Sequence, residues 1–290
     1  MKKIFALFLA VAMSLALAAC GSSSTAPAGS SAAGSSSAAA SSANAQPVEL
    51  TVFAAASMTE TLNQVIDQYK SVAPNVTVTA TYDSSGTLQT QIEQGAGCDL
   101  FISAAQKQMN ALDGSLKGDT DKNPNGEDFI LQGSRVNILE NKVVLVVPSG
   151  NPAGITSFND LKTDKLKMIA LGNSDVPVGS YSLDILAYLG LDVKAMESAG
   201  KVTYGSNVKE VTTQVSEGTV DCGIVYATDA YSAGLTVVDT ATSDMCKQVL
   251  YPAAVLKDSQ NQEAAQAFLD YIRSDACTPI FEKVGFAVVK

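Results

Sequence analysis

The stretch TVFAAASMTE, residues 51–60, passes from a strand pattern to a helix pattern within about four residues. The helix pattern is carried by apolar residues at helical spacing, which are Leu62, Val65, Ile66 and Tyr69. Ser57 is therefore expected at a helix N-terminus, where free backbone N–H groups and the positive end of the helix dipole can hold an anion. The competing interpretation is that Ser57 or Thr59 only caps the helix. The recurrence of such junctions further along the chain favours the anion site.

Composition excludes several classes of function. The 290 residues contain no histidine, which removes every Ser-His-Asp or Cys-His nucleophile and every histidine-ligated zinc site. The net charge of -10 argues against nucleic acid or an anionic membrane surface as a partner. A small anion remains compatible with this charge, because a recessed site is governed by local dipoles more than by screened surface charge.

The N-terminus has the pattern of an export signal. Residues 1–19 begin with two lysines and continue as an apolar run that is too short for a convincing membrane span. The sequence LAACG around Cys20 resembles a bacterial lipobox, which implies that Cys20 carries a lipid and anchors the mature protein to the membrane. Residues 20–47 are rich in Ser, Ala and Gly and are predicted to form a flexible tether.

The next segment alternates strand and helix patterns. Predicted strands cover residues 49–55, 77–82 and 99–103, and predicted helices cover residues 59–70 and 87–94 and a segment after residue 104. This rhythm is typical of a parallel sheet that binds ligands at the carboxyl ends of its strands. Ser57 and the pair Ser84-Ser85 both fall at such ends.

Residues 113–133 interrupt this rhythm with a polar segment. Its acidic and amide residues hint at a calcium loop, but Gly126 stands in the eighth place of that loop instead of the sixth, and position twelve is not Glu. A solvated surface insertion is the better interpretation.

The second half repeats the alternation after an apolar strand at residues 141–148, which is long enough to cross between lobes. Further strands are expected at 167–171, 201–204, 221–226 and 235–238, and helices at 181–189, at 208–217 and near 228. The chain then returns in a strand at 248–256 and ends with helices at 262–272 and 279–284. We therefore expect an α/β clamp in which each lobe is a mostly parallel sheet flanked by helices. Lobe 1 comprises residues 48–140 and 249–290, and lobe 2 residues 141–248, with the ligand cleft at the hinge.

Four strand-to-helix junctions resemble one another, and each contains a serine. They lie at Ser57, at Ser85-Gly86, at Val178-Gly179-Ser180 and at Ser206-Asn207-Val208. Each can present free backbone N–H groups, and four helix termini of roughly half a positive charge each would balance a dianion. Tyr226 ends the strand CGIVY and is expected to add its hydroxyl to the same cleft; the alternative is an ordinary buried tyrosine.

At these residues the chain resembles the periplasmic molybdate-binding proteins, the solute receptors of molybdate ABC importers. The matching pieces are VFAAASM (52–58), DSSGTLQTQIEQGAGCDLFISA (83–104), IALGNSDVPVGSYS (169–182), GIVYATDA (223–230), YPAAVLKDS (251–259) and FEKVGF (281–286). The resemblance implies the two-lobed clamp of type II binding proteins. It also implies that Ser57 and Ser85 bind ligand oxygens through hydroxyl and N–H, Val178 and Val208 through N–H, and Tyr226 through its hydroxyl.

The expected ligand is a fully deprotonated oxyanion, molybdate or tungstate. A site made of neutral donors leaves a bound proton without an acceptor, and an unpaired buried polar group costs roughly 1–3 kcal/mol. Sulfate satisfies the same condition, whereas hydrogen phosphate requires Asp83 to accept its proton. Two departures from the family pattern bear on this selectivity: Asp83 replaces a small residue, and Gly86 replaces a frequent third serine.

An enzyme using Ser57 or Ser85 as nucleophile is the weaker alternative, because the sequence offers no activating base. We therefore expect a non-enzymatic, lipid-anchored extracytoplasmic receptor. It would act as a monomer, need no cofactor or protein-bound metal, and deliver its ligand to a membrane ABC permease.

Four cysteines follow the lipobox. Export permits disulfides, and four cysteines allow three full pairings. We expect Cys98 and Cys222 to be buried thiols in different lobes, and Cys246 and Cys277 to be the better candidates for a disulfide.

Overall fold

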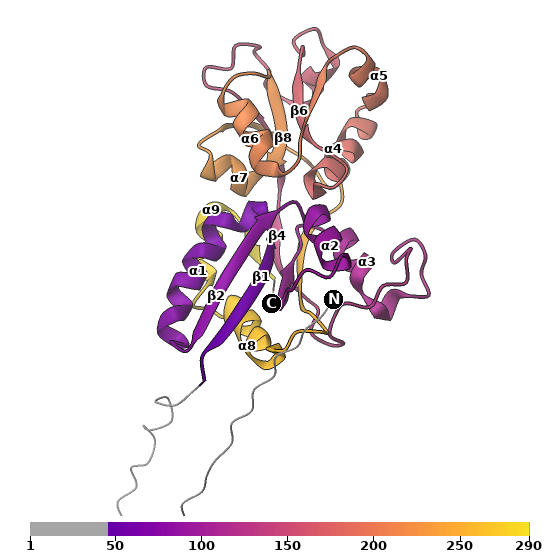
Figure 1. Ribbon diagram of the computed structural model, residues 1–290. Helices are drawn as coiled ribbons and strands as arrows, with labels where there is room; N and C mark the ends of the chain where they lie inside the picture. Colours follow the sequence, from indigo (N-terminus) through magenta and orange to yellow (C-terminus); the bar gives the residue numbers. More distant parts are fainter. Residues whose placement is uncertain (1–45, 290) are drawn as a thin grey trace, which may run out of the picture. The chain divides into compact units, whose positions relative to one another are not determined.

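The computed structural model describes residues 46–289. The predicted signal segment, Cys20 and the tether up to residue 45 lie outside the described residues. Within the described range, none of the helices combines the length and apolar character that a membrane crossing requires. Two β-sheets, each covered by helices, organise this part of the chain (Figure 1).

The first sheet has six strands in the order β11-β4-β10-β3-β1-β2. Their bounds are β1 Val48–Ala55, β2 Val76–Asp83, β3 Leu100–Ile102, β4 Val136–Asn141, β10 Val249–Val255 and β11 Ala287–Val288. β1 pairs in parallel with β2 and β3, and Ala55 stands opposite Asp83. The segments that follow β1 and β2 therefore start side by side at one edge of the sheet.

The helices associated with this sheet come from both ends of the chain. They are α1 Thr59–Val72, α2 Ser85–Glu93, α3 Gln106–Leu112, α8 Gln262–Ile272 and α9 Thr278–Val284. α1 packs on β2 and also contacts α8 and α9 (Figure 1). Apolar faces explain this packing: α1 buries Leu62, Val65 and Ile66, and α8 buries Phe268 and Leu269 at the same kind of spacing.

The second sheet has five strands in the order β7-β6-β8-β5-β9. Their bounds are β5 Val143–Val147, β6 Ile169–Gly172, β7 Val202–Gly205, β8 Cys222–Tyr226 and β9 Thr236–Thr240. β6 lies between β7 and β8 and is parallel to both, so three carboxyl ends again meet at one edge. Val178 and Val208 follow β6 and β7, and Tyr226 is the last residue of β8.

The helices of the second sheet are α4 Pro177–Tyr188, α5 Val193–Ser198, α6 Val208–Ser216 and α7 Ala227–Ser232. α4 and α6 flank β6 and β8 (Figure 1). Gly179 lets α4 begin directly against β6, because a Cβ at this position would stand 2.4 Å from the carbonyl oxygen of Gly172. The predicted start of this helix at Tyr181 is wrong: the helix begins at Pro177, whose fixed φ suits the first helical position.

The crossing between the two sheets also differs from the prediction. Residues 141–148 do not form one strand: β4 ends at Asn141 in the first sheet, and β5 begins at Val143 in the second. The chain thus crosses from the first sheet to the second at Lys142. The α/β architecture with two sheets is confirmed, but each sheet is mixed and not mostly parallel. β5 and β10, which lie next to the crossings, pair antiparallel with their neighbours.

The polar segment 113–133 is held by its own side chains. Buried Asn123 donates from Nδ2 to the carbonyl oxygens of Asp113 and Glu127 and accepts from the Glu127 amide. Asp119 accepts hydrogen bonds from Lys122, through its ammonium and its amide, and from the Asp121 amide. Two of the oxygen-bearing side chains that suggested a calcium loop are thus engaged within the segment itself.

The described cysteines are free thiols, so the predicted bridge between Cys246 and Cys277 is not formed. Cys277 is fully buried just before α9, and its thiol donates to the carbonyl oxygen of Tyr271 near the end of α8. Cys246 is half-buried and borders a groove next to the crossing strands. Cys222 is buried, as predicted, while Cys98 is only half-buried.

Candidate oxyanion site

A small cavity lies where the carboxyl ends of both sheets face one another. It holds about 190 Å³ of space free of atoms, part of it open to solvent. Of the predicted ligand residues, Ser57, Ser85, Val208 and Tyr226 line this cavity. Val178 is not among the lining residues, although its neighbours Val176 and Pro177 are.

The Ser57 junction does not serve to cap a helix. Ser57 lies in a single 3-10 turn, Ala56–Met58, that leads into α1, and neither helical segment has a side-chain cap. Its hydroxyl lies 2.8 Å from the phenol oxygen of Tyr251, and the Thr59 hydroxyl donates to the carbonyl oxygen of Ala56. The capping interpretation is therefore wrong for both residues.

At the start of α2, two adjacent serines have different roles: Ser84 caps the helix, and Ser85 lines the cavity. Ser84 caps the helix by accepting a hydrogen bond from the Thr87 amide at 3.1 Å. Ser85 is completely buried, and its hydroxyl oxygen accepts from the Ala104 amide at 3.0 Å. The Ser85 hydroxyl hydrogen is left for a further acceptor at the cavity that this residue lines.

The five-stranded sheet contributes helix termini. Val208 is the first residue of α6, and the Asn207 side chain caps that helix by accepting from the Glu210 amide. Val178 is the second residue of α4. The first amides of a helix have no intrahelical acceptor, so both positions can offer N–H groups to an anion.

Tyr226 brings a phenol from β8 to the same place. Its ring is 1% exposed, and its hydroxyl makes only a long contact of 3.5 Å to the carbonyl oxygen of Ala104. Burial raises the pKa of Tyr226 well above its usual value of 10.0, helped by the neighbouring Tyr251 and Tyr181. The phenol therefore keeps its proton and can act only as a neutral donor toward an anion.

Asp83 is the one charged residue among those that line the cavity. Its carboxylate oxygen Oδ1 accepts a hydrogen bond from the Ser84 amide at 2.7 Å. The described residues that line the cavity include no lysine or arginine. Anion binding at this point would depend on dipoles and hydroxyls, with one carboxylate nearby.

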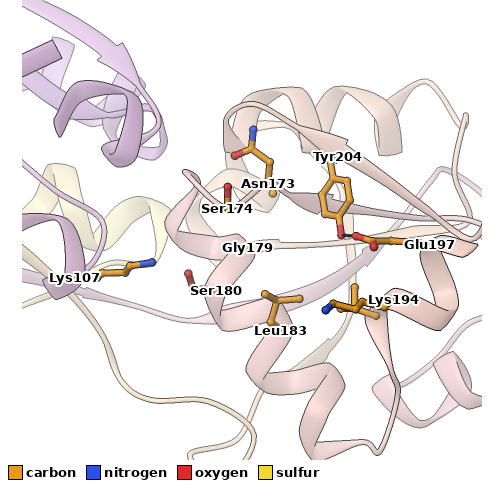
Figure 2. A pocket seen from close by; sticks show the side chains of 11 residues that line it. Lys107, Asn173, Ser174, Gly179, Ser180, Leu183, Lys194, Glu197 and Tyr204 are labelled. Carbon is orange, nitrogen blue, oxygen red and sulfur yellow. Dashed lines mark hydrogen bonds between the residues drawn. The ribbon is translucent and has the colours of Figure 1, made fainter. Parts of the chain in front are cut away.

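A larger groove beside α4 is less suited to a small ion. It encloses about 910 Å³ and is lined by Lys107 and by residues of the second sheet's helices and loops. Figure 2 shows that the Tyr204 hydroxyl and the Glu197 carboxylate bond to each other, while Lys107 and Lys194 extend from separate elements. Much of its lining is exposed, so its volume alone does not make it a binding site.

Sequence reasoning missed the buried partners behind the cavity. Tyr251, Asn141 and Thr228 form hydrogen bonds with one another or with Ser57 and are at most 3% exposed. A usable signal existed for Asn141, a polar residue between two apolar strand runs. The contact from Tyr251 to Ser57 spans 194 positions, and no local pattern indicates it.

Comparison with known proteins places this geometry in a family. The family model described as bacterial extracellular solute-binding protein matches residues 50–287. The chain belongs to this solute-binding family. The resemblance drawn from the sequence is thereby confirmed at the level of the family and its fold.

Two curated relatives and one solved structure illustrate the similarity. YvgL of Bacillus subtilis (strain 168), provisionally named an ABC transporter substrate-binding lipoprotein, is 37% identical over 82% of this chain and 86% of its own. The molybdate-binding protein ModA of Escherichia coli (strain K12) is 33% identical over 83% of this chain and 89% of its own. The periplasmic molybdate-binding protein of Azotobacter vinelandii has a TM-score of 0.69 at 21% identity, covering 83% of this chain and 100% of its own. This last likeness supports the solute-binding fold.

Proposed function

We propose that this solute-binding protein captures molybdate or tungstate in the cavity between its two sheets and delivers it to a membrane ABC permease. The observation that carries the proposal is the convergence of Ser57, Ser85, Val208 and Tyr226 on one small cavity. The relatives named for molybdate binding support the choice of ligand. The provisional lipoprotein name of YvgL supports anchoring through Cys20 in an extracytoplasmic location.

The size and chemistry of the cavity favour a tetrahedral anion. A water-sized sphere can occupy only about 10 Å³ of it, far below the roughly 300–1,000 Å³ typical of sites for larger organic ligands. Donors come from both sheets, so a bound anion would stabilise the arrangement in which the two sheets face each other closely. A solute receptor needs this coupling of ligand and closure, and no catalytic base is required.

Asp83 gives a specific reason to consider phosphate as a second ligand. A carboxylate at the cavity can accept the proton of hydrogen phosphate, which a site of donors alone would leave unpaired. Sulfate and molybdate carry no such proton and gain nothing from Asp83. Phosphate is therefore the discriminating comparison.

A thermal-shift series with molybdate, tungstate, sulfate and phosphate tests the proposal. At a hundredfold excess over Kd, a ligand of the folded state adds about 2.7 kcal/mol to the free energy of unfolding. For a protein of this size that corresponds to a rise in Tm of roughly 5–11 °C. We expect this rise with molybdate and tungstate, and a clearly smaller one with sulfate and phosphate.

Tyr226→Phe provides the site-specific arm of this experiment. The variant should keep its ligand-free Tm and bind molybdate more weakly, because it loses one hydroxyl donor at the cavity. A phosphate shift equal to or above that of molybdate would replace the molybdate proposal with the phosphate one. An unchanged molybdate Kd in Tyr226→Phe would contradict the site.

A further inference from the structure

A buried chain of hydrogen bonds runs behind Ser57. The Ser57 hydroxyl lies 2.8 Å from the Tyr251 phenol oxygen, which lies 3.2 Å from Asn141 Nδ2. The same Asn141 nitrogen lies 2.9 Å from the hydroxyl oxygen of Thr228. These hydrogen bonds thus link the 3-10 turn after β1, strand β10 and the end of β4, which belong to the first sheet, with α7 of the second sheet.

The direction of these bonds follows from the backbone at the crossing. The Lys142 amide donates to Asn141 Oδ1 at 2.8 Å, which fixes the amide group with its oxygen toward Lys142 and its NH₂ toward Tyr251 and Thr228. Asn141 therefore donates, and the Tyr251 oxygen accepts. The Tyr251 hydroxyl hydrogen then has the Ser57 oxygen as its acceptor.

The Tyr251 side chain is well placed to keep this direction. Its ring packs edge-on against Tyr226 and Phe286, with centroid distances of 5.9 and 5.2 Å. Burial raises the pKa of Tyr251 well above 10.0, so the phenol keeps the hydrogen that it donates. Ser57 accepts from Tyr251, and its own hydrogen remains for the cavity that it lines.

The Ser85 hydroxyl is oriented in the same way by a different partner. Its oxygen accepts from the Ala104 amide, which can only donate. The hydroxyl oxygens of Ser57 and Ser85 thus each accept a hydrogen bond from a group behind the cavity.

We infer that Tyr251 and Asn141 are positioning residues that hold the Ser57 hydroxyl as a donor toward the oxyanion, as the Ala104 amide does for Ser85. This inference rests on the proposed function, because it assigns a role to Ser57 at the same cavity. A hydroxyl without such a partner can turn its lone pairs to the ligand, and it must be reoriented when an anion binds. Because Tyr251 holds the Ser57 hydroxyl hydrogen toward the cavity, no reorientation is needed when an anion binds. A ligand that carries a proton is disfavoured, because that proton would meet a donor.

The test is a double-mutant cycle of Tyr251→Phe and Ser57→Ala with molybdate as the probe, measured by calorimetry. Tyr251→Phe should raise the molybdate Kd roughly five- to tenfold, the size expected from one hydrogen bond. In the Ser57→Ala background the same change should have almost no effect, because Tyr251 acts through Ser57. Tyr271→Phe is the matched control, since it removes a buried tyrosine hydroxyl that makes no hydrogen bond to Ser57 or Asn141.

Phosphate supplies a readout that simple loss of packing would not move. Freed from Tyr251, the Ser57 oxygen can accept a proton, so hydrogen phosphate should lose less affinity than molybdate in Tyr251→Phe. Equal losses for the two anions, or a full effect of Tyr251→Phe in the Ser57→Ala background, would overturn the inference. A wild-type protein that binds none of the four oxyanions would instead overturn the proposed function, and the two failures are thus distinguishable.

Discussion

Two of the contacts that join the halves of the molecule near the cavity differ in kind. At the start of α2, the Gly86 amide donates to the Asp175 carbonyl oxygen at 2.9 Å, so backbone touches backbone. At the start of α6, the Lys209 ammonium lies 2.8 Å from Glu60 and 3.3 Å from Asp229. The first contact depends on the absence of a side chain, and the second on long charged side chains that can adjust.

The difference between these contacts indicates which of them sets the distance between the two halves around the cavity. A backbone contact fixes the separation of two elements within tenths of an ångström, because neither side can yield. An ion pair with exposed members tolerates movement and contributes little net free energy. We therefore expect the geometry of the closed cavity to depend on Gly86 and the electrostatics of its rim to depend on Lys209.

The largest effect is expected from Gly86→Ala. A Cβ at this position would stand 2.5 Å from the Asp175 oxygen and within 3 Å of its Cα and Cβ, so the two elements must separate. Overpacking of this kind costs about 1–3 kcal/mol, which corresponds to a molybdate Kd roughly five- to 150-fold higher. Calorimetric titration of the variant measures the change.

Gly97→Ala is the control for this prediction. An added Cβ at Gly97 meets nothing within 4 Å, so its Kd should match that of the wild type. The ligand-free Tm of Gly86→Ala should not fall, since alanine favours the helix and the clash is relieved by opening. A Kd equal to the wild-type value would show that Gly86 does not limit closure.

Lys209, Glu60 and Asp229 form a cluster of charged side chains, here called the Lys209 cluster. The second-largest effect is expected from its buried member, Asp229. Asp229 is 1% exposed, and its carboxylate pairs with the Lys209 ammonium, which lies 3.3 Å from Oδ1. Burial raises the pKa of Asp229 to about 6, and Glu60 adds to this, while Lys209 opposes it. Because the folded state holds this proton more tightly than the unfolded state, stability falls as pH rises from about 4 to 6.

The Asp229→Asn variant tests whether Asp229 makes the protein less stable as pH rises. The variant should be more stable than the wild type near pH 7.5, and the difference in free energy of unfolding should shrink by about 2–3 kcal/mol on going to pH 4. Urea denaturation at both pH values measures it, and other carboxyl groups cancel in the difference. A difference that is independent of pH, or that grows toward pH 4, would contradict the assigned pKa direction.

The sequence predicted the parts of the site that rest on local pattern. The Ser57 junction, the start of α6 at Val208 and the helix at residues 262–272 follow from apolar spacing and strand ends, and the structure has them. The predicted start of α4 at Tyr181 lies four residues too late, although Pro177 is a residue that suits the first helical position. β4 was missed because polar Asn137 and Glu140 interrupt its apolar run.

Long-range contacts account for what the sequence could not show. The contact of Gly86 with Asp175 and the hydrogen bonds of Tyr251 to Ser57 and Asn141 join residues that are distant in the chain. Their geometry depends on how the two sheets meet, which no residue pattern encodes. In the sequence Gly86 is the absence of a frequent serine, whereas in the structure it is the point where α2 closely approaches the backbone of Asp175.

The exposed half of the Lys209 cluster should have the smallest effect. The side chains of Glu60 and Lys209 are 45% and 30% exposed, and exposed pairs contribute about 0.2–1 kcal/mol. Because this pair joins α1 to α6 across the two sheets, Glu60→Gln should raise the molybdate Kd by roughly 1.5- to fivefold at low salt. The effect should vanish near 1 M NaCl, where the Debye length is about 3 Å. Asp67→Asn is the control, since it breaks the exposed Asp67–Lys70 pair within α1 alone, and an equal effect there would remove the special role of the α1 to α6 bridge.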